Sequence, residues 1–255
     1  MAFHPGLNQV VLNSRNWNEF YILDHGTSTE EAAGFAGDLL YRWGNPAAYG
    51  RGTNTEQVLY TQHDPHWLND EGPTALGSNP DETILVFNNG NARPSGAAST
   101  VDELTLPLQP DGTYLLAEGE SFGPESLDWS YPQFPFLDFF SPNISGAQRQ
   151  PNGNTLICEG SDGHLFEVTP DGDIVWEYIT AYSQFGAVIQ GDNPIGNSTF
   201  RAYRYAPDHP AFDGRDMSPG DPVEDSPLPF DCQLYPAPND TTAQGLSPGE
   251  VHLRI

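Results

Sequence analysis

The segment QHDPHWLND, residues 62–70, holds the side chains best suited to chemistry in this sequence. His63 and His66 flank Asp64 within four positions. A neutral imidazole is a competent nucleophile and moves protons near neutral pH. Two alternatives stay open for the same residues. One is a metal site, because His-x-x-His with an aspartate offers nitrogen and oxygen ligands. The other is a turn or core histidine bonded to Asp64 or to the backbone.

Cofactor sites have no signature elsewhere in the chain. No second cluster supplies an obvious third metal ligand, and single Asp-Gly turns are usually only turns. The sequence also has no nucleophile elbow, phosphate loop or dinucleotide fingerprint. We therefore expect neither a metal nor another cofactor.

The charge balance restricts the partners of this protein. Asp and Glu number 35 against nine basic residues, all of them arginine, and the formal net charge is −26. Nucleic acid and anionic membranes would be repelled, so neither is expected as a partner. Such acidity indicates a solvated surface and suits a halophile or marine source. No run of apolar residues is long enough for a membrane span, and no signal peptide is visible.

The clearest structural pattern covers residues 144–178, which read as four short strands. The predicted strands are 144–149, 155–159, 164–169 and 173–178. Asn-Gly and Asp-Gly pairs separate them, and such pairs close tight antiparallel hairpins. Four antiparallel strands in about 35 residues form the unit of a β-propeller blade.

Two other regions fit the same template, and the predicted fold is all-β. Residues 63–131 supply an inner strand near His63 and strands at 83–88, 99–106 and 125–132. Residues 9–43 supply three strands without an innermost one, at 9–14, 19–24 and 38–43. Residues 199–205 read as the inner strand of a further blade. Repetition of this kind predicts a β-propeller, with a β-sandwich as the alternative.

The expected organisation is a partial propeller over 1–213 and an extended or disordered tail over 214–255, rich in Pro and Asp. About three blades cannot close a ring, so we expect missing N-terminal blades or a partner chain to complete it. A helical turn is expected within 25–38, where Thr27 and Glu30 have capping-box spacing. We expect no disulfide between Cys158 and Cys232.

Six segments together resemble the bacterial arylsulfotransferase family. They are LNSRNWNEFYILDHGTSTEEAAG (12–34), GDLLYRWGNPAAYGRGT (37–53), QHDPHW (62–67), ILVFNNGNARPSG (84–96), SGAQRQPNGNTLICEG (145–160) and FRAYRY (200–205). The resemblance implies a six-bladed β-propeller that moves sulfuryl groups between phenols without a nucleotide donor. It also implies a periplasmic or secreted protein, with an aryl sulfate and a phenol as small-molecule partners.

The resemblance also suggests site residues. His63 matches a histidine of the family's central channel, and Arg93 matches the arginine that follows the family's FxNG turn and binds sulfate oxygens. When the strand at 144–149 is laid on that of His63, Ser145 falls opposite His63 and Gln148 opposite His66. Substrate binding is therefore predicted for His66, Ser145 and Gln148. It is also predicted for Arg204 of the FRAYRY segment. Strand alternation predicts that His66 faces away from His63 unless Pro65 disturbs the pattern.

Two departures from the family pattern concern the histidines of the site. No histidine occurs in SGAQRQ, near which the family's nucleophile is expected, and His164 comes one strand too late, at a position predicted to be exposed. The chain also begins just after the place of a further channel histidine, and His4 is predicted to lie in a turn. The alternative function is a non-catalytic propeller module, and an alternative nucleophile is His63.

Overall fold

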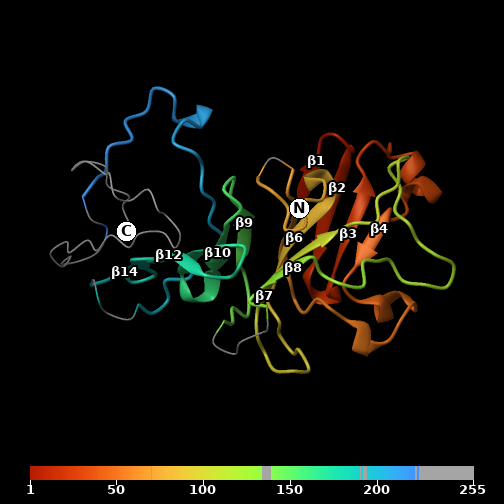
Figure 1. Ribbon diagram of the computed structural model, residues 1–255, viewed down its shortest axis with the longest axis horizontal. Coiled ribbons are helices and arrows are strands. Elements are labelled where there is room, and N and C mark those ends of the chain that lie inside the picture. Colours follow the sequence, from red (N-terminus) through yellow and green to blue (C-terminus); the bar gives the residue numbers. More distant parts are fainter. Residues whose placement is uncertain (70, 134–138, 190, 192–193, 222, 224–255) are drawn as a thin grey trace.

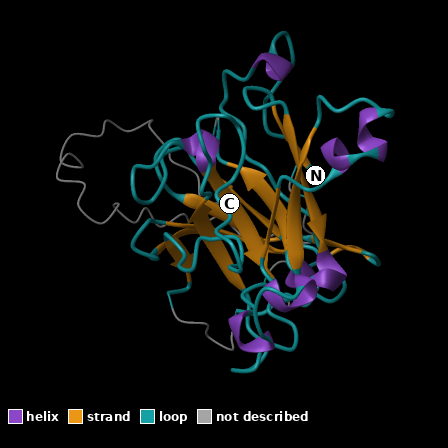
Figure 2. Cartoon of the chain, turned by 90° about the vertical axis from the view of Figure 1, so that its right-hand side faces the viewer, coloured by secondary structure: helices purple, strands orange, loops and turns teal. Residues whose placement is uncertain are grey.

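The computed structural model describes residues 1–69, 71–133, 139–189, 191, 194–221 and 223 (Figure 1). Strands are the main regular elements of these residues, and every helix is a short 3₁₀ turn, so the predicted all-β class is confirmed. Figure 2 shows the strands gathered in the middle of the molecule, with the short helices in the loops around them. Within the described residues, no helix is long and apolar enough to cross a membrane.

Three four-stranded antiparallel sheets form the body of the protein, and neighbouring strands follow chain order in each. The first sheet contains β1 (Ala2–His4), β2 (Gln9–Ser14), β3 (Glu19–Asp24) and β4 (Tyr41–Trp43). The second contains β5 (His63–Trp67), β6 (Thr83–Asn88), β7 (Thr100–Thr105) and β8 (Trp129–Tyr131). The third contains β9 (Gly146–Arg149), β10 (Thr155–Glu159), β11 (His164–Val168) and β12 (Ile174–Ile179). A two-stranded hairpin, β13 (Tyr182–Ser183) and β14 (Gly186–Ala187), was not predicted.

The turns of the third sheet form where the sequence predicts them. Gly153, Gly163 and Gly172 adopt φ values of 90°, 60° and 91°, which an L side chain rarely tolerates. These glycines close the hairpins between consecutive strands from β9 to β12. The strands predicted at 83–88 and 155–159 match β6 and β10 residue for residue.

The outer parts of the prediction need two corrections. The first sheet does have a fourth strand before residue 9, which the prediction lacked, because Asn8 at φ 53° turns the chain and lets β1 pair with β2. His4 is therefore the last residue of a strand and is buried, and it does not lie in a turn. The segment 199–205 forms no strand. It lies beside the third sheet through isolated bonds, such as that from the Ser145 amide to the Phe200 carbonyl, and lacks a ladder of them.

The three sheets stack face to face, and alternation along β6 supplies both interfaces. Ile84 and Val86 belong to a buried cluster shared with the first sheet. Leu85 and Phe87 belong to a second buried cluster shared with the third sheet. A strand that is apolar on both faces is typical of the middle layer of such a stack. As a result β5 packs against β1 and β2, and β9 packs against β5 and β6.

The helices are all single 3₁₀ turns in the described residues. They are η1 (Arg15–Trp17), η2 (Glu31–Ala33), η3 (Phe35–Gly37), η4 (Pro46–Tyr49), η5 (Asn54–Glu56), η6 (Pro80–Glu82), η7 (Gly160–Asp162) and η8 (Pro210–Phe212). The helical turn predicted within 25–38 is present, but the predicted capping pair is displaced by one residue. Ser28 and Glu31 exchange the hydrogen bonds that were expected from Thr27 and Glu30.

Two further predictions fall partly outside the described residues. Cys158 is buried in β10 as a free thiol, and burial raises its pKa to about 12. Cys232 lies outside the described residues. Of the predicted tail, residues 214–221 and 223 are described and contain no helix or strand.

Candidate functional site

The two histidines of QHDPHW point to the same side of the second sheet because β5 contains a bulge. His63 pairs with Phe87 and His66 with Leu85, so three steps along β5 oppose two along β6. Asp64 adopts φ 59° at the irregularity, next to Pro65. The proline segment therefore disturbs strand alternation, and the condition under which His66 would share the side of His63 is met.

The same bulge changes which residues of the third sheet correspond to the histidines. Leu156 and Cys158 lie on the face of β10 that is turned away from the second sheet. Leu85 and Phe87 lie on the corresponding face of β6, which is turned away from the first sheet. Gln148 pairs with Leu156, so it does occupy the place of His66.

Ser145 does not occupy the place of His63, contrary to the prediction. Gly146 pairs with Cys158 and takes that place, because β9 lacks the extra residue of β5. The Ser145 hydroxyl is buried and bonds to Ser141 Oγ and to the Gly160 amide. A Cβ on Gly146 would lie 2.4 Å from Asp64 Oδ2, so this position has no room for a side chain.

His63 is half-buried, and its ring is held by Asn89. The His63 Nδ1 atom lies 2.7 Å from Asn89 Oδ1. Burial lowers the pKa of His63, and the positive charges of Arg15 and Arg201 lower it further, although hydrogen bonds to Asn89 and to the Thr61 backbone oppose this. The imidazole is therefore neutral at neutral pH, which is the form that has a free lone pair.

Asp64 connects β5 to the segment 199–205. Arg201 Nη1 lies 2.8 Å from Asp64 Oδ1 and donates to the Tyr203 hydroxyl at 3.2 Å. The Asp64 side chain is only 7% exposed, whereas that of Arg201 is 26% exposed. Burial raises the pKa of Asp64, opposed by the charges of His66 and Arg201. A guanidinium that is paired and still reaches solvent is suited to bind oxygens of an anionic group.

His66 is a charged residue of the interface between the second and third sheets. Its Nδ1 atom donates to the Asp64 carbonyl at 2.7 Å, and its Nε2 atom lies 3.4 Å from Glu71 Oε2. The same Glu71 oxygen accepts from the Arg149 amide of β9 at 2.9 Å. Burial alone would lower the pKa of His66, but Glu71 and Asp64 outweigh it and raise the pKa to about 9.

Stability should therefore depend on pH through His66. Its folded pKa of about 9 exceeds the ordinary 6.5, so the contribution is full below pH 6.5 and is lost as the pH rises toward 9. The free energy of unfolding should fall by up to about 3 kcal/mol across that window. Urea unfolding of wild type and His66→Gln at several pH values measures this, with the exposed His25→Gln as control. Equal pH slopes in wild type and His66→Gln would contradict the assignment.

Arg93 and Arg204, both predicted to bind substrate, have other partners. Arg93 donates to Thr100 Oγ1 at 3.3 Å and lies over the Tyr60 ring, 5.5 Å from its centroid. Arg204 pairs with Glu167 and lies over the Trp176 ring. The positive charges that act on His63 are those of Arg15 and Arg201. The structure thus brings Arg15 and Arg201 close to His63, rather than Arg93 or Arg204.

Asn89 and Arg201 are the site residues that sequence reasoning missed. Arg201 is in the FRAYRY segment, and Asn89 is in the FNNG turn, so both lie in segments that resemble the family. Neither segment indicates which of its polar residues turns toward β5. That depends on contacts across 26 residues for Asn89 and 137 for Arg201, counted from their partners His63 and Asp64.

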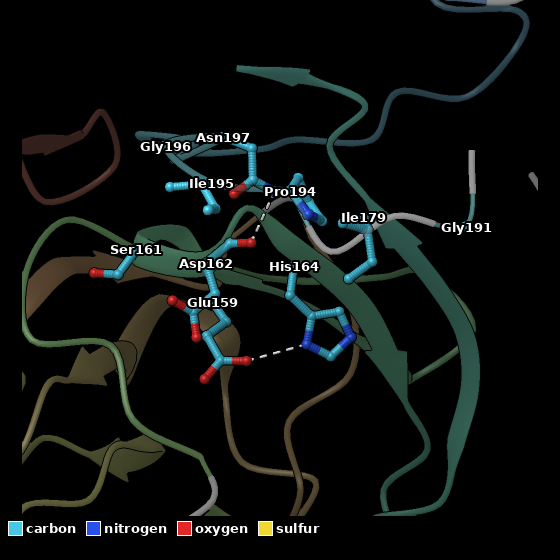
Figure 3. A pocket seen from close by; sticks show the side chains of 10 residues that line it. All are labelled: Glu159, Ser161, Asp162, His164, Ile179, Gly191, Pro194, Ile195, Gly196 and Asn197. Atoms are coloured by element: carbon cyan, nitrogen blue, oxygen red, sulfur yellow. Dashed lines mark hydrogen bonds and ion pairs between the residues drawn. The ribbon is translucent and has the colours of Figure 1, made fainter. Parts of the chain in front are cut away.

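A hollow of about 730 Å³ lies beside β10 and β11 (Figure 3). Glu159, Asp162 and His164 line it, and the His164 ring bonds to Glu159 at 3.0 Å. The side chain of His164 is 21% exposed, so it is half-buried rather than exposed as predicted. Carboxylates on the wall make this hollow unsuitable for a sulfate ester.

The described residues contain no group of three or more His, Cys, Asp or Glu side chains arranged to hold a metal ion. Comparison of the chain with protein-family models and with curated proteins finds no match.

Proposed function

We propose that this protein is an arylsulfotransferase-like β-propeller, which transfers a sulfuryl group from a phenolic sulfate ester to a phenol. The observation that carries the proposal is His63, a neutral, half-buried imidazole on the innermost strand of the second sheet, with Arg201 nearby. His63 is the nucleophile in this proposal, and Arg201 binds the sulfuryl oxygens.

The arrangement of the sheets supports the propeller. Each of the three large sheets is a meander in which strands pair in chain order, as in a blade. Adjacent sheets share buried apolar clusters, so they stack as successive blades do. A ring would be completed by further blades or by a partner chain.

The reaction proceeds in two displacements. The lone pair of the His63 ring forms a bond to sulfur while the bond from sulfur to the aryl oxygen breaks, and the aryl oxygen leaves with the electron pair. The hydroxyl of the acceptor phenol then attacks the same sulfur, loses its proton to solvent and displaces the imidazole. Charge stays on the sulfuryl oxygens throughout, and a guanidinium stabilises it.

One observation favours a second function, that of a non-catalytic binding module. The position that corresponds to His63 in the third sheet is Gly146, and Asp64 Oδ2 fills the space of any side chain there. A mechanism that needs a histidine on that strand has no residue for it. The module would bind aryl sulfates through the same His63 and Arg201 pair without turnover.

The test is transfer from 4-nitrophenyl sulfate to phenol, without a nucleotide, at low and at molar salt. We expect nitrophenolate release that depends on added phenol, with ping-pong kinetics. Folded protein that binds the ester but releases no nitrophenolate would favour the binding module. Folded protein that neither binds nor turns over the ester would contradict both functions.

A further inference from the structure

The surroundings of Asn89 allow only one orientation of its side-chain amide. Asn89 is fully buried, and its Nδ2 atom donates to two backbone carbonyls, those of Ser141 at 2.8 Å and Ile144 at 3.1 Å. Carbonyl oxygens only accept hydrogen bonds, so a flipped amide would set its own oxygen against both of them. The Oδ1 atom must therefore face the ring of His63, 2.7 Å from Nδ1.

The orientation of the amide determines where the proton of His63 lies. An amide oxygen only accepts, so the Nδ1 atom must carry the hydrogen that it accepts. In a neutral imidazole the other nitrogen, Nε2, then holds the lone pair. We propose that Asn89 is a positioning residue that fixes His63 in the Nδ1-protonated tautomer and leaves the Nε2 lone pair available to a ligand. The role of this tautomer in transfer rests on the proposed function, but the tautomer itself does not.

The backbone around Asn89 holds the amide in place. Gly90 follows at φ 74°, and a Cβ there would lie 1.7 Å from the Ala98 carbonyl oxygen, so the chain can turn this tightly only with glycine. The Asn89 carbonyl accepts a hydrogen bond from Ser99 Oγ at 2.9 Å. Ser99 Oγ in turn accepts one from the Ser141 amide at 3.0 Å. Asn89 is thus tied to the same loop through both its side chain and its backbone.

A fixed tautomer matters for the chemistry of a nucleophile. A ring free to exchange tautomers would present a protonated, non-nucleophilic Nε2 for part of the time, and a neighbour that orients the base prevents this. Asn89 is the described side chain that hydrogen-bonds to the His63 ring, and the Thr61 backbone is its second hydrogen-bonding partner. A neutral amide does this without the charge that a carboxylate would add.

The direct test is the nitrogen spectrum of the whole protein labelled with ¹⁵N-histidine. Long-range ¹⁵N–¹H correlations distinguish the two neutral tautomers, and the signals missing in His63→Gln identify His63. We expect a protonated Nδ1 and an unprotonated Nε2 in the wild type. A protonated Nε2, or a mixture of the two tautomers, would overturn the inference.

The second arm replaces the amide. In Asn89→Ala we expect His63 to shift toward the Nε2-protonated tautomer that predominates in free histidine. The matched control is Asn91→Ala, because Asn91 lies in the same turn but donates to Thr61 and to the Pro142 carbonyl rather than to His63. Retention of the Nδ1-protonated tautomer in folded Asn89→Ala would show that another group sets it, and would overturn the inference.

The outcome is separable from that of the proposed function. A wild type with Nδ1 protonated but no sulfuryl transfer would overturn the proposed function and leave the role of Asn89 intact. Sulfuryl transfer by a wild type whose His63 Nε2 is protonated would support the proposed function and overturn the role of Asn89. If Asn89→Ala does not fold, the wild-type spectrum alone decides.

Discussion

Replacing His63 with glutamine is expected to reduce kcat for transfer from 4-nitrophenyl sulfate to phenol by at least about 10³-fold, since removal of a nucleophile can cost about 10⁶-fold. Glutamine fills similar space and still bonds to Asn89 Oδ1, 2.7 Å from the ring in the wild type. Its amide nitrogen has no available lone pair, so no bond to sulfur can form. The loss should therefore fall on kcat more than on KM, because Arg201 remains to bind the ester.

The control for this variant is His25→Gln. His25 is exposed, lies in the loop after β3 and bonds through Nδ1 to Asn8 Oδ1 at 3.3 Å, far in sequence from β5. We expect wild-type kcat in this control and equal thermal stability in both variants. A His63→Gln protein that turns over at the wild-type rate would place the nucleophile elsewhere.

The central strands could be predicted from the sequence because their signals are local. In β6 and β10, runs of apolar residues are buried on both faces and bounded by turn residues, and length alone separates them from helices. The three residues of β1 are too few to show any period. They become a strand only because β2 offers hydrogen-bonding partners.

The segment 199–205 failed for the opposite reason. Its alternating pattern is that of a strand, but in the described residues no neighbouring strand pairs with it, and backbone groups need such partners to form a ladder. Its arginines instead bond to carboxylates on two different strands, Arg201 to Asp64 of β5 and Arg204 to Glu167 of β11.

The site was predicted in outline, and its details depend on one extra residue. QHDPHW could be recognised as chemically capable, but the bulge at Asp64 decides that His66 shares the side of His63. The same bulge moves Gly146, rather than Ser145, to the place of His63 in the third sheet. A change of one residue in register reverses the side of every later side chain, so an ungapped comparison of two strands cannot detect it.

An ion pair and a tryptophan recur where the inner segment of one unit meets the preceding sheet. Arg149 of β9 pairs with Glu103 of β7 and lies over Trp129, 5.1 Å from the ring centroid. Arg204 pairs with Glu167 of β11 and lies over Trp176 at 5.0 Å. The two arrangements differ in burial, because the side chain of Arg149 is 3% exposed and that of Arg204 is 40% exposed. They therefore form a matched pair for measuring the effect of burial on the same interaction.

Glu103→Gln should lower the free energy of unfolding by about 3–5 kcal/mol, because it leaves the Arg149 charge buried without a partner. Burial already raises the pKa of Glu103, and Arg149 is the main group that opposes this, so the carboxylate and the guanidinium depend on each other. Glu167→Gln should cost no more than about 1 kcal/mol, since water can solvate the exposed Arg204. Urea unfolding of the two variants and the wild type measures the difference. Equal losses would mean that burial does not decide the strength of these pairs.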